Sequence, residues 1–199
     1  DPSLNLPSGS ALAASWDADL AYRYGAASAS EARRKDVDVV LGPTINLHRS
    51  PLGGRHFECL SEDPELTGEL GAAYVRGLQD NGVAATPKHY VANDSETDRF
   101  TVDVQVDARA LRELYLAPFE RTVADAGAWA LMSSYNSVDG VTMTENDLLE
   151  NPLNSEWGFD GVVISDWTAV RSLGAVPAAQ DLAMPGPAPA YADLVAAVR

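Results

Sequence analysis

The chain has 199 residues, of which 46% are hydrophobic and 22% are charged, a balance that fits one globular domain and excludes a disordered chain. Aspartate and glutamate number 29 against 14 lysines and arginines, and the formal charge of −15 argues against binding to nucleic acid or an anionic membrane. No stretch is long and apolar enough to span a membrane, and the single cysteine, Cys59, excludes an internal disulfide and a cysteine zinc site.

The first half of the chain alternates short apolar runs with helical patterns. Residues 37–41 form an apolar run that predicts a buried strand, and residues 65–81 carry apolar side chains at helical spacing. A second buried strand is predicted over 83–86. Valines that alternate with polar residues over 102–106 predict a half-exposed strand.

The second half repeats this alternation. Asp107 can cap a long helix to about residue 126, which Pro118 should kink. Buried strands are predicted over 129–132 and 161–164, with one or two short helices over 147–157 between them.

The C-terminal part is expected to add a short strand at 183–185 and the start of a helix over 191–199. Apolar strand, polar tip and helix thus recur in one order, which is the pattern of parallel β/α units. The predicted fold class is therefore α/β, with a (β/α)8 TIM-barrel-like domain. Such a barrel typically needs about 250 residues, and only five or six strands are counted, so the barrel is expected to be incomplete.

Asp166 and Trp167 follow a predicted strand at the edge where a (β/α)8 barrel has its site. A carboxylate in that place is costly unless it is paired or faces a solvent-filled mouth. From the pattern alone, a catalytic role and a helix cap are equally supported for Asp166. Trp167 offers the flat apolar face that sugar sites often use, although plain core packing is the commoner role of tryptophan.

Lys88 and His89 lie at the end of another strand. Lys88 could be a Schiff-base amine or a hydrogen-bond donor, and His89 an acid/base group, a donor or a metal ligand. The alternative is a solvated lysine beside a structurally bonded histidine. Two donors at the end of one strand match a polyhydroxylated ligand, which favours a functional role for Lys88 and His89 over the structural alternative. Tyr135, after the next strand, could line the same site or simply end its strand.

Arg55 lies in a glycine-rich loop, where it could pair with Glu58 or reach a ligand. From the pattern alone, an exposed arginine is the favoured interpretation. His48 and His56 are eight residues apart in this loop, which is no useful metal spacing. We therefore predict neither a metal site nor a cofactor.

Several motifs, taken together and in order, resemble the N-terminal barrel of glycoside hydrolase family 3. The resemblance runs from about residue 6 to the C-terminus. It rests on seven segments: GRHFE at 54–58, KHYVAN at 88–93, LYLAPF at 114–119, SYN at 134–136, EWGFDG at 156–161, VISDW at 163–167 and DLAMPG at 181–186.

This resemblance implies a role for each candidate residue. Asp166 would be the catalytic nucleophile of a retaining mechanism, which needs one carboxylate to attack the anomeric carbon. Tyr135 would lie beneath the sugar, and Trp167 would flank it. Three residues would hydrogen-bond the hydroxyls of the terminal sugar: Arg55, Lys88 and His89.

Residues 90–99 resemble the β-glucosidase branch of the family more than the N-acetylglucosaminidase branch, whose corresponding loop carries glycine and histidine. In the β-glucosidase branch the acid/base is a glutamate in a second, α/β sandwich domain. That domain and the family's early Asp-Gly-Pro motif are both missing from residues 1–199. We therefore expect a single domain, 1–199, that is an internal part of the barrel, incomplete at its N-terminus and inactive by itself.

The resemblance implies a hydrolase that releases terminal β-D-glucose from small-molecule β-glucosides through a covalent intermediate on Asp166. The alternatives are a β-xylosidase-type activity, an inactive fragment, and a lyase or aldolase that uses Lys88 as a Schiff base. The expected partner is a small β-glycoside, and neither nucleic acid nor a membrane is expected. The sequence leaves the oligomeric state and the localisation open.

Overall fold

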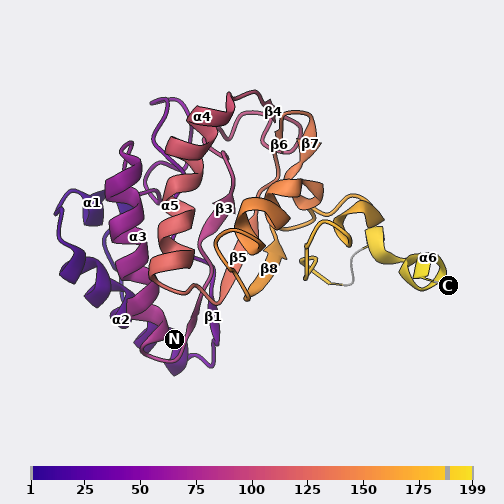
Figure 1. Cartoon of the computed structure of the whole chain (residues 1–199). Coiled ribbons are helices and arrows are strands. Elements are labelled where there is room, and N and C mark those ends of the chain that lie inside the picture. The colour runs from indigo at the N-terminus through magenta and orange to yellow at the C-terminus, as the bar shows by residue number, and fades with distance from the viewer. Residues whose placement is uncertain (1, 187–188, 199) are drawn as a thin grey trace.

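Short parallel strands and helices alternate along residues 2–186 and 189–198, the part of the chain that the computed structural model describes (Figure 1). The strands nearest the candidate residues pair only in parallel with one another. They form a pair followed by a three-stranded sheet: β1 (Val39–Val40) with β2 (Ala84–Ala85), then β3 (Lys88–Tyr90), β5 (Ala130–Ser133) and β8 (Val162–Ser165).

Single β-bridges join these strands into one arc. Thr44, just after β1, pairs in parallel with Lys88 at the start of β3, and Ile164 in β8 pairs in parallel with Leu182. Neighbouring segments therefore follow one another in space as they do in sequence, which is the connectivity of a (β/α) barrel. A doubly wound sheet would reverse its strand order. Over the described residues the arc stays open and does not close into a ring.

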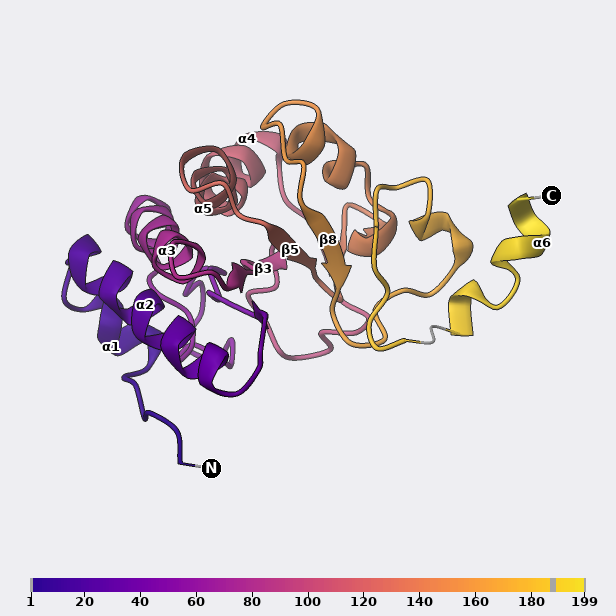
Figure 2. The same cartoon turned by 90° about the horizontal axis from the view of Figure 1, so that it is seen from below.

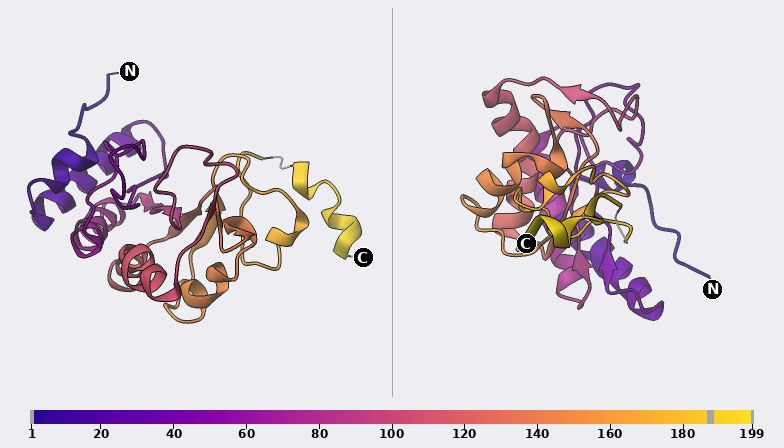
Figure 3. Two further views of the ribbon diagram at one scale, coloured as in Figure 1. Left: turned by 90° about the horizontal axis from the view of Figure 1, so that it is seen from above. Right: turned by 90° about the vertical axis from the view of Figure 1, so that its right-hand side faces the viewer.

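The helices line one side of this arc. Figure 2 shows α3 (Pro64–Gln79) and α5 (Ala117–Glu120) on the same side of β3, β5 and β8, where the crossovers between parallel strands run. Helices α1 (Gly9–Ala13) and α2 (Ala18–Arg34) lie at one end of the molecule, and α6 (Leu194–Val198) lies at the other (Figure 3).

Aspartate side chains cap the long helices at their N-termini. The Asp63 carboxylate accepts a hydrogen bond of 2.9 Å from the Leu66 N–H at the start of α3. Asp107 accepts from the backbone N–H groups of Arg109 and Ala110 at the start of α4 (Ala108–Ala110). The prediction that Asp107 begins a helix is confirmed.

The helix that Asp107 begins contains three kinds of turn. After α4 come π-helical turns over Leu111–Leu116, then α5, then further π-helical turns over Arg121–Asp125. Pro118 lies in α5 between the two wider segments, and the hydrogen-bonding register changes around the position that lacks an N–H. The helical run covers the predicted range, but it is not one regular α-helix.

A second, smaller sheet lies beside the arc (Figure 1). Strand β4 (Asp103–Val104) pairs in parallel with β6 (Ser137–Val138), which pairs antiparallel with β7 (Val141–Thr142). The strand predicted over 102–106 is therefore present but shorter, and it does not belong to the barrel arc. The short helices predicted over 147–157 are present as turns over Asp147–Leu149 and Glu150–Asn154.

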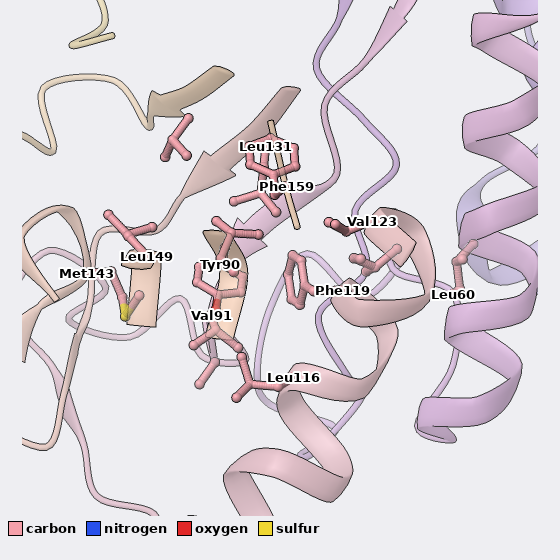
Figure 4. Close-up of a cluster of buried hydrophobic side chains, with 14 of the residues drawn as sticks. Leu60, Tyr90, Val91, Leu116, Phe119, Val123, Leu131, Met143, Leu149 and Phe159 are labelled. Carbon is pink, nitrogen blue, oxygen red and sulfur yellow. The ribbon is translucent and has the colours of Figure 1, made fainter. Parts of the chain in front are cut away.

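Tyr90 joins the sheet to the helices in the hydrophobic core. The side chain is 0% exposed, and its ring meets that of Phe119 edge-on, with 5.1 Å between the ring centroids. Its hydroxyl donates to the backbone oxygen of Leu148 at 2.8 Å. Figure 4 shows Tyr90 beside Phe119, with Leu116 and Leu131 in the same cluster. Burying such side chains is the main stabilising term, at roughly 1.5–3 kcal/mol for a large one.

Two apolar residues are more exposed than predicted. Trp129 was expected in a buried strand, but β5 begins at Ala130 and the Trp129 side chain is 50% exposed. Val39 is 44% exposed, because within the described ranges β1 has a strand partner on one side only.

The C-terminal elements also differ from their predictions. The short strand expected at 183–185 is a single bridge at Leu182. The helix expected over 191–199 is α6, which begins at Leu194, and residue 199 lies outside the described residues.

Helix α2 was not predicted, because its buried face carries only small side chains. That face consists of Ala21, Gly25, Ala29 and Ala32. A Cβ on Gly25 would lie 2.4 Å from the backbone oxygen of Tyr74 in α3. A helix with this face carries no stripe of large apolar residues, yet it packs closely against α3.

Substituting Gly77 should test this close helix contact. A Cβ on Gly77 would lie 2.1 Å from the backbone oxygen of Tyr22, so Gly77→Ala should lower the free energy of unfolding by about 1–3 kcal/mol, as overpacking does. Gly71→Ala in the same helix is the matched control, since its Cβ would meet only side-chain methyl groups, at 3.1 and 3.4 Å. Denaturant unfolding of the full-length protein measures both, and equal midpoints would contradict the contact.

Candidate active site

A hollow of about 220 Å³ opens at the carboxyl ends of the parallel strands, and we call it the site hollow. Lys88 and His89 reach it from β3, and Asp166 reaches it directly after β8. Parallel strands end at the same edge, which brings residues far apart in sequence together. The residues that line it are Leu41, Arg55, Lys88, His89, Arg99, Met132, Tyr135, Asp166 and Trp167, among them all six predicted site residues.

Two groups lie close to the Asp166 carboxylate, a backbone N–H and a ring nitrogen. The residue is 8% exposed, its Oδ2 lies 3.5 Å from His89 Nε2, and its Oδ1 accepts a hydrogen bond of 2.7 Å from the Trp167 N–H. The sequence analysis left open whether Asp166 is a helix cap. Over the described residues, no helix begins directly after it, since the next helical turn is Leu173–Ala175. Its burial in a polar hollow therefore favours a chemical role over a capping role.

Asn46 fixes the orientation of His89. The Asn46 Nδ2 donates to the His89 backbone oxygen at 2.9 Å, and its Oδ1 accepts from the His89 backbone N–H at 2.8 Å. These two bonds define which end of the amide is oxygen, and that oxygen also lies 3.2 Å from His89 Nδ1. A proton on Nδ1 gives this oxygen a donor, so the contact favours the tautomer with Nδ1 protonated.

The neutral form of His89 is the favoured one. Burial, followed by the positive charges of Lys88, Arg55 and Arg99, holds the pKa of His89 well below its usual range. In a neutral ring with Nδ1 protonated, Nε2 has no proton and points at Asp166 as an acceptor. From the sequence His89 was expected among the donors, whereas these contacts favour Nε2, in the lining of the site hollow, as an acceptor for a ligand hydroxyl.

Lys88 lines the site hollow, where burial and neighbouring carboxylates have opposite effects on its pKa. Burial lowers the pKa of the Lys88 ammonium, and the carboxylates of Glu58 and Asp166 act in the opposite direction. Burial would raise the pKa of Glu58, but its contact with Arg55 outweighs this effect and lowers the pKa. Thr44 Oγ1 also donates to Glu58 at 3.1 Å. The arginine–glutamate pair considered from sequence is therefore present, and Arg55 also lines the site hollow.

Tyr135 presents a protonated hydroxyl to the site. Burial, and then the charge of the nearby Asp166, raises the pKa of Tyr135 to about 12, so the phenol remains a neutral donor around neutral pH. The ring of Phe100 packs edge-on against that of Tyr135, with 4.5 Å between the ring centroids. Trp167 is 41% exposed, which places it at the mouth of the hollow and not in the core.

Arg99 and Asn46 are site residues that the sequence analysis did not find. Arg99 lies in a loop of irregular structure, and Asn46 does not line the site hollow but supports His89 from behind. Arg99 lies at the end of the segment 90–99, which was used only to assign the branch of the family. No periodic pattern marks loop residues, so only the fold reveals their proximity.

Residues 2–186 and 189–198 contain neither a metal-binding cluster nor a membrane-spanning helix. No group of three or more His, Cys, Asp or Glu side chains in these ranges could hold a metal ion. No helix there has the length and apolar character needed to cross a bilayer.

Comparison with known proteins decides the family. The model of the glycosyl hydrolase family 3 N terminal domain matches residues 3–184. The chain belongs to glycoside hydrolase family 3. A β-glucosidase from Rhizobium radiobacter is 52% identical over 197 residues, which cover 98% of this chain and 24% of that protein. An exo-α-(1→6)-L-arabinopyranosidase from Bifidobacterium longum is 45% identical and covers 100% of this chain and 26% of that protein.

Solved structures of family 3 enzymes have the same fold. The structure of β-glucosidase 3B from Thermotoga neapolitana in complex with glucose matches with a TM-score of 0.90 and 46% sequence identity, covering 92% of this chain and 26% of that chain. The predicted fold class, part of a (β/α) barrel, is confirmed. The chain spans about a quarter of the length of the relatives it matches.

The protonation of His89 can be observed directly. Neutron diffraction from a deuterated crystal of the full-length protein at about pH 7 should show a deuteron on Nδ1, shared with Asn46, and none on Nε2. Because burial lowers the pKa of His89, its ring should gain a second deuteron only at a pH below the usual pKa range of histidine. A deuteron on Nε2 at about pH 7 would contradict the orientation that Asn46 imposes.

Proposed function

We propose that the site hollow is the sugar-binding and nucleophile part of a retaining β-glucosidase active site, with Asp166 as the nucleophile. The observation that carries the proposal is a buried carboxylate among hydrogen-bonding groups in a chain of family 3. Retaining glycosidases attack the anomeric carbon with one carboxylate, and a second carboxyl group protonates the leaving oxygen. We assign the first of these roles to Asp166.

The reaction would proceed in two displacements. An Asp166 oxygen would attack C1 of the terminal sugar, forming an ester bond as the bond from C1 to the aglycone oxygen breaks and that oxygen takes a proton from the acid. Water, deprotonated by the same group, would then attack C1 and release the sugar and the Asp166 carboxylate. Two inversions at C1 would give net retention of configuration.

The other polar residues of the hollow suit a neutral polyol. Lys88, Arg55 and the Tyr135 hydroxyl can donate to sugar oxygens, and His89 Nε2 can accept from a sugar hydroxyl. His89 Nε2 and Asp166 Oδ2 lie 3.5 Å apart, and each could accept a hydrogen bond from a different sugar hydroxyl. Such contacts lower the barrier where they strengthen as positive charge develops at C1.

The acid/base group is proposed to lie outside the site hollow. Asp166 is the one carboxylate among the described residues that line the hollow. Glu58 is already engaged by Arg55, and Glu96 by Arg99. A retaining pair needs carboxyl groups about 5–5.5 Å apart, so we propose that a glutamate outside residues 1–199, in a second domain, completes the site. In the same proposal, residues 1–199 act as a single domain within a longer enzyme.

Glucose is the favoured sugar, since relatives of about 50% identity are β-glucosidases and one solved relative holds glucose. A β-xylosidase-type activity is the alternative within the family. The arabinopyranosidase among the relatives indicates that similar barrels serve other pyranoses. A Schiff-base role for Lys88 is the lower alternative: burial lowers the pKa of its ammonium, which would suit a free amine, but the chain belongs to a family of glycoside hydrolases. The proposed ligand is a small β-glycoside, with neither nucleic acid nor a membrane as partner.

Replacing Asp166 tests the nucleophile. In the full-length protein, Asp166→Gly should lower kcat/KM on an aryl β-glucoside by about 10³-fold or more, because no group replaces the attacking oxygen. Added azide should restore turnover in the variant and give a glucosyl azide of α configuration, since one displacement inverts C1. Rate assays and NMR of the product measure both effects.

A matched control is Asp36→Gly, at an exposed residue shortly before β1 whose φ of 55° suits glycine. This variant should keep its activity and should not respond to azide. Full activity of Asp166→Gly, or a β-configured azide product, would refute the assignment of the nucleophile.

A further inference from the structure

Glu96 ties together two loops at the edge of the site hollow. Its backbone N–H donates to the Gly53 oxygen at 2.7 Å. Its side chain passes so close to Gly54 that a Cβ there would lie 2.9 Å from Glu96 Cγ, and Gly54 has a φ of +81°. Only glycine at position 54 admits both the backbone conformation and the contact. The loops that carry Arg55 and Arg99 therefore meet at Glu96.

The two carboxylate oxygens of Glu96 face two different arginines of the site. Oε2 lies 2.7 Å from Arg99 Nη1, and Oε1 lies 3.7 Å from Arg55 Nη1. The side chains of Glu96, Arg99 and Arg55 are 25%, 29% and 25% exposed, so solvent only partly screens the contacts. Both arginines line the site hollow, whereas Glu96 does not.

The two arginines do not depend on Glu96 equally. Arg55 has a second carboxylate partner in Glu58, which contacts its Nε. Among the described residues, Arg99 has no carboxylate partner but Glu96. Its other contacts are the ring faces of Phe100 and Tyr135, with Cζ 4.9 and 5.0 Å from their centroids. A cation–π contact fixes distance but allows the guanidinium to rotate, so the orientation of Arg99 depends on Glu96.

Charge balance gives Glu96 a second effect. Arg55, Lys88 and Arg99 bring three positive charges to a hollow that holds the single carboxylate of Asp166. Like charges that share a site repel one another, and an unpaired guanidinium would turn toward solvent or toward Asp166 itself. An arginine paired with Asp166 would compete with the attack on C1. Glu96 Oε2, 2.7 Å from Arg99 Nη1, offers that guanidinium a different carboxylate.

We propose that Glu96 is a positioning residue that sets the orientation of Arg99 before the sugar binds, so that its guanidinium meets a sugar hydroxyl and not Asp166. This inference rests on the proposed function of the site hollow. Glu96 itself touches neither the sugar nor the reacting atoms in this arrangement.

Kinetics of Glu96→Ala and Glu96→Gln in the full-length protein test the role. Without Glu96, Arg99 would lose the orientation in which it donates a charge-assisted hydrogen bond to the sugar. Glu96→Ala should therefore raise KM for an aryl β-glucoside about tenfold or more. The inhibition constant for glucose should rise by the same factor. The value of kcat should change less, because the sugar contact is lost in the ground state and the transition state alike. Glu96→Gln keeps an acceptor oxygen and should fall between the wild type and Glu96→Ala.

Two comparisons separate positioning from a purely structural effect. In a background of Arg99→Ala, the Glu96→Ala change should add less than about twofold, because residues that act through one another are not additive. The matched control is Glu113→Ala, which breaks a 3.0 Å pair with Arg109 on the exposed helix surface and should leave KM unchanged.

The outcomes distinguish this role from the proposed function. If the wild type hydrolyses the β-glucoside but Glu96→Ala resembles Glu113→Ala, only the positioning role is overturned. It is also overturned if the Glu96→Ala effect is unchanged in the Arg99→Ala background. If Glu96→Ala fails to fold, Glu96→Gln decides the question by the same comparison. A wild type that does not hydrolyse β-glycosides overturns both proposals.

Discussion

The burial of a carboxylate at the end of a strand governs the site. Asp166 is 8% exposed, and a charge that leaves water is stable only with compensating partners. Arg55, Lys88 and Arg99 supply positive charge around it, and His89 offers a neutral acceptor instead of a further cation. Carboxylates behind these groups, such as Glu58, hold the cations without entering the hollow. Among the described residues, positive charge therefore surrounds Asp166 without a lysine or arginine ion pair to its carboxylate.

This arrangement depends on the geometry of parallel strands. Lys88 and Asp166 are 78 positions apart in the sequence, and they meet because β3, β5 and β8 end at one edge. The helices that cover the strands must pack closely for the arc to hold its curvature. Gly25 and Gly77 allow this at the contact of α2 with α3.

The sequence revealed the elements in which apolar periodicity is strong, and it did not reveal those in which small or irregular residues dominate. The strands at β5 and β8 and the helix α3 have large apolar side chains at regular spacing and were predicted. Helix α2 buries alanine and glycine, so its pattern gives no signal. Among the site residues, those at strand ends could be predicted, whereas Arg99 in an irregular loop could not. The roles themselves came from the resemblance to the family, because spacing alone left Asp166 divided between a catalytic role and a helix cap.

The most direct measurement is to trap the covalent intermediate. An activated 2-deoxy-2-fluoro-β-glucoside slows the second displacement, so the full-length enzyme should accumulate a glycosyl ester that mass spectrometry of its proteolytic peptides can locate. The predicted result is a single labelled peptide with the sugar on the Asp166 carboxylate. A label on a different residue, or hydrolysis that releases the sugar with inverted configuration and no trapped ester, would contradict the central role of Asp166.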